Sequence, residues 1–341
     1  MVRLSIAWLL SVTVPLAIRG VLARDARTAR DLFNVDFSTD DNGGCAYAGE
    51  NEIDTELEEI YQILNIGTVL VDEWDHADEA KRLLTAFFGT PNDAQRAQLT
   101  SNYEEVMDFL RNGRLFNGEK PYLFCNSNWL TRQRVADTVL DANGQRIFTN
   151  PPQNTQALTI RELQRRDGTA GYTYWWTSRM NAYLALPGSS PRTYCDRDAR
   201  NKGVTTEPIA LGRPYIPFTS ITICPNGFEN RWRRRNSAAV NPVRASAVTA
   251  RSQSIGSLYP TAMTLFHELF HLVLGNTNTF VDPNTLYEEY GVAGMLGLSA
   301  DQALRNPESM ALVAVAYDIT SHEGQVGQDF VEFHTGYATR G

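Results

Sequence analysis

The sequence predicts an α+β protein that is mainly helical and also contains a small β-sheet. Between residues 53 and 110, apolar residues repeat at three- and four-residue steps, the spacing typical of amphipathic helices. Residues 121–125 and 218–224 are instead strand-like, and each segment ends in a cysteine. Helical patterns return at 260–274 and 291–317, so helices are expected to dominate the fold.

The overall composition excludes some classes of partner. The chain has 341 residues, 43% of them hydrophobic, and a net charge of -8 at pH 7. This charge provides no global basic field, so we expect no nucleic-acid partner. The short basic run at 231–235 is interpreted as a solvated loop or a processing site. Beyond the N-terminal segment, no stretch reaches the roughly 18 apolar residues of a membrane span, so we expect no stable membrane insertion. We also expect a monomer.

Residues 1–23 have the features of a secretory signal peptide. Arg3 provides the positive charge, residues 4–18 are largely apolar, and residues 21–23 fit the cleavage positions. The alternative is a buried N-terminal helix. Export would make the protein secreted and extracellular, and the polar residues 24–44 would then form a flexible leader.

The cysteines fit an exported protein, because export makes disulfides permissible. The four cysteines allow three complete pairings, and no pair has the short spacing of a zinc knuckle. We therefore expect two disulfides among Cys45, Cys125, Cys195 and Cys224.

Turn and cap residues separate the predicted elements. Gly89-Thr90-Pro91 interrupts the first helical segment, after which Asn92 or Asp93 can cap the next helix. The run Asp141-Ala-Asn-Gly144 predicts a hairpin turn. Residues 148–217 carry much of the proline, glycine and aromatic content and receive no assignment.

Residues 267–271 read His-Glu-Leu-Phe-His and carry the strongest functional signal. His267 and His271 lie four residues apart on one face of a helix, where one metal ion can bridge both imidazoles. Glu268 would lie beside that ion and can take a proton from bound water. Zinc best matches two neutral imidazoles, a carboxylate and an open position for water. The alternative is a buried amphipathic helix whose histidines are satisfied by hydrogen bonds.

The third metal ligand must lie outside this zinc helix, which Pro260 and Gly275 bound. No His-x-x-Gly-x-x-His continuation follows His271, which argues against the metzincin pattern. The candidate ligands are the nearby carboxylates and two more distant histidines: Asp282, Glu288, Glu289, His322 and His334.

Segments on both sides of the zinc helix form a recognisable set. Those before it are Cys45, Phe87-Phe88-Gly89-Thr90, Tyr122-Leu-Phe-Cys125, Cys195-Asp196 and Ile221-Thr-Ile-Cys224-Pro225. Those after it are Tyr290-Gly291, Leu298-Ser-Ala-Asp-Gln-Ala303 and Asn306-Pro-Glu-Ser309. Together with the zinc helix, this set resembles the aspzincins, the deuterolysin-like zinc metalloendopeptidases secreted by fungi. The resemblance covers most of the mature chain.

The resemblance implies a zincin-like metalloprotease fold with a small β-sheet beside the active-site helix. It implies the disulfides Cys45–Cys125 and Cys195–Cys224. It also implies a single catalytic domain, residues 45–341, with a helical first part, an insertion-rich middle and a zinc-site part. Their ranges are 45–115, 126–215 and 216–341.

The sequence departs from the family pattern at the third ligand, and its loop after His271 is longer than usual in the family. The third ligand of the family is an aspartate in a Gly-Thr-x-Asp-x-x-Tyr-Gly motif, whereas this chain has Tyr287 at the aspartate position. Because a glutamate is one methylene longer than an aspartate, we expect the adjacent Glu288 to reach the metal, with Glu289 and Asp282 as alternatives. The resemblance also implies that Tyr290 donates a hydrogen bond to the tetrahedral oxyanion.

These observations lead to three hypotheses about function. The first is a secreted zinc endopeptidase that acts on proteins or peptides with Glu268 as general base. The second, motivated by Tyr287, is a non-catalytic secreted zinc-binding protein on the same scaffold, active in adhesion, metal capture or host interaction. The third is a structural protein whose histidine helix only packs in the core. Chelator-sensitive hydrolysis separates the first two, and metal analysis separates the third.

Overall fold

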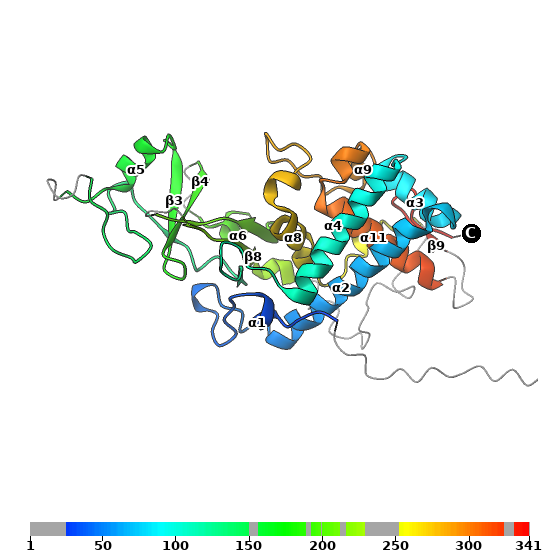
Figure 1. The fold of residues 1–341 in the computed structure, drawn as a ribbon, viewed down its shortest axis with the longest axis horizontal. Coiled ribbons are helices and arrows are strands. Elements are labelled where there is room, and N and C mark those ends of the chain that lie inside the picture. Colours follow the sequence, from blue (N-terminus) through cyan, green and yellow to red (C-terminus); the bar gives the residue numbers. More distant parts are fainter. Residues whose placement is uncertain are drawn as a thin grey trace, which may run out of the picture.

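The protein combines a helical body with a β-sheet lobe. A computed structural model describes residues 25–149, 156–188, 192–198, 200–211, 216–228, 252–323 and 331–340. In Figure 1 the long helices gather at the right, and strands β3 and β4 with helix α5 project at the left. The predicted α+β class is therefore confirmed.

The helical body is formed mainly by the helices of residues 29–112, 263–274 and 292–323, which pack against one another. Its helices are α1 (Ala29–Leu32), α2 (Glu50–Asp72), α3 (Asp78–Phe88), α4 (Asp93–Asn112), α8 (Met263–Leu274), α9 (Val292–Met295), α10 (Ala300–Ala303) and α11 (Pro307–Glu323). Helix α2 packs against α4 and α11, and α8 packs against α4 and α11. The main hydrophobic core lies between these helices.

Local sequence signals set the ends of these helices. At the start of α4, the side chain of Asn92 accepts from the Gln95 N–H and that of Gln95 accepts from the Asn92 N–H, a capping box. At the end of α8, Gly275 has φ +84° and its N–H donates to the His271 carbonyl at 3.0 Å. Helix α11 begins at Pro307, a residue that suits the first turn of a helix, so the helical pattern at 291–317 is divided there. The helical predictions for these segments are confirmed.

A three-stranded sheet lies against the zinc helix α8. Its order is β1 (Tyr122–Phe124), β8 (Ser220–Ile223) and β5 (Gly203–Thr206). Strand β1 runs parallel to β8, and β5 runs antiparallel to it. Both strands predicted from the sequence, β1 and β8, are present, and α8 packs against β8 and against β5, which was not predicted.

The β lobe is an antiparallel sheet with its own small apolar clusters. Its strands, in sheet order, are β2 (Thr131–Arg132), β3 (Tyr172–Thr177), β4 (Ala182–Pro187), β6 (Ile209–Ala210) and β7 (Ile216–Pro217). The predicted turn after Val139 is present, because the Asp141 N–H donates to the Gln145 carbonyl at 2.7 Å. Much of the predicted insertion-rich middle forms this lobe, yet β5 from the same stretch joins the sheet at the zinc helix.

The remaining helices and strands are short: α5 (Ile160–Arg166), α6 (Tyr194–Arg197), β9 (Val331–Glu332) and β10 (Thr339–Arg340). Strands β9 and β10 form an antiparallel pair, and β9 packs against helix α11.

Residues 25–44 differ from the flexible leader that their polar composition predicted for residues 24–44. Leu32 and Phe33 are buried in the main core. The backbone also follows β1, because Asn34 pairs with Tyr122 in a parallel bridge. A few apolar residues thus anchor the segment while its polar residues face solvent, and the prediction of a flexible leader is wrong for the described residues.

The disulfides pair as the aspzincin resemblance implied. Cys45, which precedes α2, is bonded to Cys125 at the end of β1. Cys195 in α6 is bonded to Cys224 at the end of β8. Two disulfides are compatible with a secreted protein.

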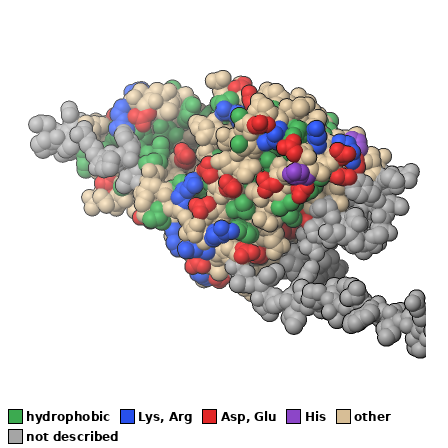
Figure 2. All heavy atoms as spheres, turned by 45° about the vertical axis from the view of Figure 1, so that its right-hand side comes forward, with side chains coloured by type: hydrophobic (Ala, Val, Ile, Leu, Met, Phe, Trp, Pro, Cys, Tyr) green, Lys and Arg blue, Asp and Glu red, His purple; other side chains and the backbone are tan. Residues whose placement is uncertain are grey.

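Two sequence predictions fall outside the described residues: the signal peptide at 1–23 and the basic run at 231–235. Within the described ranges, no helix combines the length and apolar character that crossing a membrane requires. On the face drawn in Figure 2, acidic and basic side chains are interspersed over the coloured residues.

Candidate metal centre

Helix α8 presents His267 and His271 from one buried face. Apolar residues such as Phe266 and Phe270 fill the other faces, so the helix is buried on most sides. The Nε2 atoms of the two imidazoles lie 3.1 Å apart. This convergence follows directly from the four-residue spacing on a helix.

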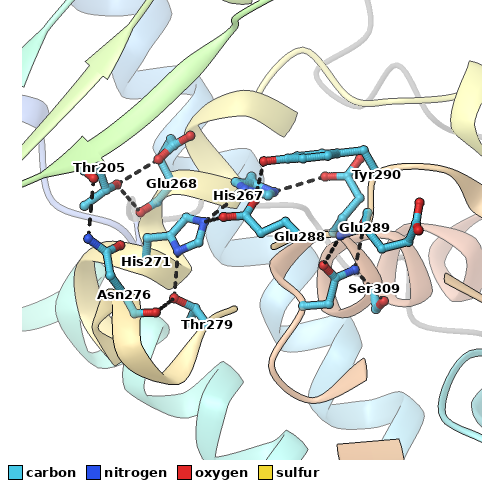
Figure 3. A network of polar contacts seen from close by, with 12 residues as sticks. Thr205, His267, Glu268, His271, Asn276, Thr279, Glu288, Glu289, Tyr290 and Ser309 are labelled. Carbon is cyan, nitrogen blue, oxygen red and sulfur yellow. Dashed lines mark hydrogen bonds and ion pairs between the residues drawn. The ribbon is translucent and has the colours of Figure 1, made fainter. Parts of the chain in front are cut away.

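The other ring nitrogens define which tautomer each histidine adopts. His267 Nδ1 lies 3.1 Å from Glu308 Oε2, and His271 Nδ1 lies 2.7 Å from Thr279 Oγ1 (Figure 3). The Thr279 hydroxyl donates its one hydrogen to the Gly275 carbonyl at 3.0 Å, so it accepts from His271. A carboxylate also only accepts. In their neutral form, which is the form that binds a metal, both rings therefore carry their proton on Nδ1 and direct an Nε2 lone pair at each other.

Glu288 completes this cluster of acceptor atoms. Its Oε2 lies 3.0 Å from His267 Nε2, and its Oε1 lies 3.0 Å from His271 Nε2. With Nδ1 protonated, the three groups face one another without a proton between them, an arrangement that a cation stabilises. Ligand atoms bound to one zinc ion in tetrahedral geometry are roughly 3.3 Å apart, close to the observed separations. His267, His271 and Glu288 therefore form a group that could hold a metal ion.

The pKa values of the cluster show the same preference for positive charge. Burial lowers the pKa of His267, but hydrogen bonds with Glu288 and Glu308 outweigh burial and raise it well above its ordinary value. Burial raises the pKa of Glu288, but hydrogen bonds with His267 and His271 outweigh that effect and lower it. The carboxylate side of the cluster thus favours a positive charge at the imidazoles.

Glu268 lies beside the cluster and is held by strand β5. Thr205 donates its hydroxyl to Glu268 Oε2 at 2.8 Å. A Cβ atom at Gly203 would lie 2.8 Å from Glu268 Oε1, so the absence of a side chain there gives the carboxylate its space. Burial is the main cause that raises the pKa of Glu268, and the Thr205 hydrogen bond opposes it. The carboxylate therefore accepts a proton more readily than an ordinary glutamate.

Tyr290 covers the open side of His267. Its ring stacks on the His267 ring, with 5.5 Å between centroids and 23° between planes. Its hydroxyl donates to Glu288 Oε2, although 59% of the residue is exposed. Desolvation and the nearby Glu288 carboxylate both raise the pKa of this phenol, so it remains a hydrogen-bond donor at neutral pH.

A cavity of about 560 Å³ opens beside these groups. Its walls include Glu268, His267 and Tyr290 from the cluster. Elsewhere it is lined by Tyr194, Asp198, Arg200, Asn201, Lys202, Gly203, Tyr259, Met263, Thr264 and Glu308. The cavity is large enough to receive part of a peptide beside the reactive groups.

The other candidate ligands lie elsewhere or are engaged differently. Glu289 accepts from Tyr287 and points away from the histidines in Figure 3. Asp282 caps a tight turn through the Asn284 N–H. His334 pairs with Glu332. The side chain of His322 lies outside the described residues. Among the described candidates, the geometry brings Glu288 alone to the histidine pair.

Three residues that position the reactive groups were missed by the sequence analysis. Glu308 and Thr279 bind the histidines, and Thr205 binds Glu268. Glu308 lies in the Asn306–Ser309 segment, where it was noted only as part of a resemblance. The only local signal for Glu308 was a glutamate directly after Pro307, a residue that suits the start of a helix. Thr205 lay in the unassigned stretch 148–217 and carried no signal.

Comparisons with protein-family models, curated proteins and solved structures gave no match to this chain. The function of this chain is therefore inferred from the residues and geometry of the site.

Proposed function

We propose that this protein is a secreted zinc-dependent endopeptidase and a divergent member of the aspzincins with a zincin-like fold. The observation that carries the proposal is the buried convergence of His267, His271 and Glu288 beside a cavity that Glu268 also lines. The disulfide pairs, which agree with those implied by the resemblance, support the same family.

The proposed chemistry assigns one task to each group. His267, His271 and Glu288 would hold zinc, which, when bound, lowers the pKa of a coordinated water and polarises a carbonyl. Glu268 takes the proton from the water and passes it to the leaving amine, a task suited to a carboxylate with a raised pKa. Tyr290 would donate a hydrogen bond to the oxyanion, for which its hydroxyl must turn its one hydrogen away from Glu288 Oε2, the acceptor that it contacts in the structure.

The surroundings of the site suit an extended peptide substrate. Strand β5 is the outer strand of its sheet and lies beside Glu268 through Gly203 and Thr205. Among the described strands β5 pairs only with β8, and its outer edge, where the Thr205 carbonyl accepts from Asn276 Nδ2 at 3.5 Å, could pair with a peptide backbone if this contact opens. The aromatic walls from Tyr194 and Tyr259 can then contact a substrate side chain.

The test combines metal removal with replacement of the base. Hydrolysis of casein should disappear with a chelator and return with zinc. Glu268→Gln should retain one zinc per chain and lose activity by about 10²- to 10⁴-fold, because it keeps the shape but cannot accept the proton. Chelator-insensitive cleavage, or a fully active Glu268→Gln variant, would exclude this mechanism.

The same experiment addresses the second hypothesis. Tyr287 stands where the family has its metal-binding aspartate, and this observation favours a zinc-binding protein without catalysis. Stoichiometric zinc without turnover on a broad peptide library would support that function.

A further inference from the structure

The loop that carries Glu288 presents two adjacent glutamates in opposite directions. Glu288 faces the two imidazoles, whereas Glu289 points away from them (Figure 3). The contacts on the far side of the loop therefore help to decide which carboxylate faces the histidines.

The side chain of Glu289 is fully engaged on the far side of the loop. Its Oε2 accepts from the Tyr287 hydroxyl at 2.6 Å, and its Oε1 accepts from the Gly291 N–H at 2.8 Å. A Cβ atom at Gly294 would lie 2.2 Å from the Glu289 carboxyl carbon, so this carboxylate packs directly on the backbone of α9. Both oxygens and the packing hold Glu289 away from the histidines.

The backbone of Glu289 is held from a second element by a buried amide. Asn306 Oδ1 accepts from the Glu289 N–H at 3.1 Å, and Asn306 Nδ2 donates to the Glu289 carbonyl at 2.9 Å. The same Nδ2 donates to Ser309 Oγ at 2.8 Å, and Asn306 is completely buried. Because each amide group has a partner, the loop is held at one angle to α11.

The position of Asn306 couples the two sides of the metal centre. It lies two residues before Glu308, which binds His267 Nδ1. One short stretch at the start of α11 therefore orients a ligand on the helix and, through Glu289, the ligand on the loop. Such outer contacts orient metal ligands and raise metal affinity.

We propose that Tyr287, Glu289 and Asn306 form a loop clamp that selects Glu288 as the third zinc ligand and sets the zinc affinity. The three are positioning residues and do not touch the metal. The proposal rests on the zinc site proposed above. It gives Tyr287, which replaces the aspartate of the family pattern, a direct part in the geometry of the site.

The test measures the zinc dissociation constant by competition with a chromophoric chelator, using the full mature protein. Asn306→Ala removes both bonds to the Glu289 backbone and should raise the dissociation constant by about 10-fold to 100-fold. Tyr287→Phe removes one hydrogen bond to a charged group and should raise it by about tenfold.

Two control variants separate positioning from general stability. Asn126 is a buried asparagine that also bonds to a distant backbone, through the Asp40 and Gly44 carbonyls. Asn126→Ala should lower the melting temperature and leave the zinc dissociation constant within about twofold, since it removes no contact near the metal. Tyr172→Phe alters a partly exposed tyrosine in β3 and should change neither quantity.

The outcomes distinguish this inference from the proposed function. An Asn306→Ala variant that melts earlier but binds zinc like the wild type overturns the clamp. If Asn306→Ala does not fold, an unchanged zinc affinity in the exposed Tyr287→Phe variant overturns it. A wild type that binds zinc with the predicted variant losses, but hydrolyses no peptide, supports the clamp and excludes the peptidase. A wild type that binds no zinc excludes both.

Discussion

The two sides of the candidate metal centre are built in different ways. On one side, His267 and His271 project from the buried helix α8, and Glu308 and Thr279 fix their rings. On the other side, Glu288 belongs to a loop whose neighbouring residues face solvent. Leu286, Tyr287 and Tyr290 are all exposed.

This difference indicates which side of the site can change the zinc affinity. A helix packed on several sides fixes the distance between two ligands regardless of the metal. The loop has fewer buried apolar contacts, and Leu286 adopts the left-handed region with φ +54°. We therefore expect zinc to change the loop far more than the helix, and loop substitutions to alter zinc affinity with little change in global stability.

The largest effect is expected when Glu288 is replaced, and this variant tests which carboxylate of the loop is the third zinc ligand. Glu288→Ala removes the group within 3.0 Å of both imidazoles. Because a lost ligand costs more than a lost supporting contact, the zinc dissociation constant should rise by more than about 100-fold. Asp282→Asn is the matched control and should change it only slightly. A strong loss in the Asp282 variant with a tolerant Glu288→Ala would reverse the assignment.

The second effect is a direct comparison of loop and helix by hydrogen exchange. Zinc at about 100 times its dissociation constant stabilises the bound form by about 2.7 kcal/mol, which corresponds to roughly 100-fold slower opening. The amides of Glu289 and Gly291, which bond to Asn306 and to Glu289, should gain most of this protection. Amides in the middle of α8 should gain less. Equal gains on both sides would show that the metal centre opens as one unit.

The helix side of the site could be predicted from the sequence, whereas the loop side could be predicted only in part. The helix side was predictable because the spacing of His267 and His271 is a local property of an α-helix. Glu288 was expected from its place beside Tyr287, with Glu289 and Asp282 as alternatives, and the sequence could not show the contacts of Asn306 with the Glu289 backbone, which form only after folding. A pattern within one segment cannot contain such a contact.

In the fold too, local patterns predicted the helices but left most of the β lobe unassigned. Helices α2, α4 and α8 were predicted from periodicity and from cap residues such as Asn92 and Gly275. Most of the β lobe received no assignment because its strands, apart from the six-residue β3 and β4, are very short, and their pairing is decided by the packing of the sheet. Strand β5 was missed for this reason, although it carries Gly203 and Thr205 to Glu268.

A smaller effect is expected from the residues that support the helix side. Glu308→Gln keeps an acceptor for His267 Nδ1 but removes the negative charge that makes the imidazole a stronger donor to zinc. The zinc dissociation constant should rise by about tenfold, near the lower end of such effects, while α8 remains folded by circular dichroism. Glu50→Gln alters an exposed carboxylate paired with Arg30 and serves as the control. An unchanged affinity in Glu308→Gln would mean that helix packing alone orients His267.

The smallest effect concerns the pH dependence of activity. It tests strand β5, which belongs neither to helix α8 nor to the Glu288 loop but contacts Glu268 through Thr205. Burial raises the pKa of Glu268, and the Thr205 hydrogen bond from β5 lowers it. A general base works only when deprotonated, so activity should fall as pH falls through the pKa of Glu268. Thr205→Val removes the bond that favours the charged form, so the acid limb of kcat/KM should move to higher pH, and Thr205→Ser should restore it. An acid limb that stays in place in the valine variant would show that the approach of β5 at Gly203, rather than the Thr205 hydroxyl, controls the base.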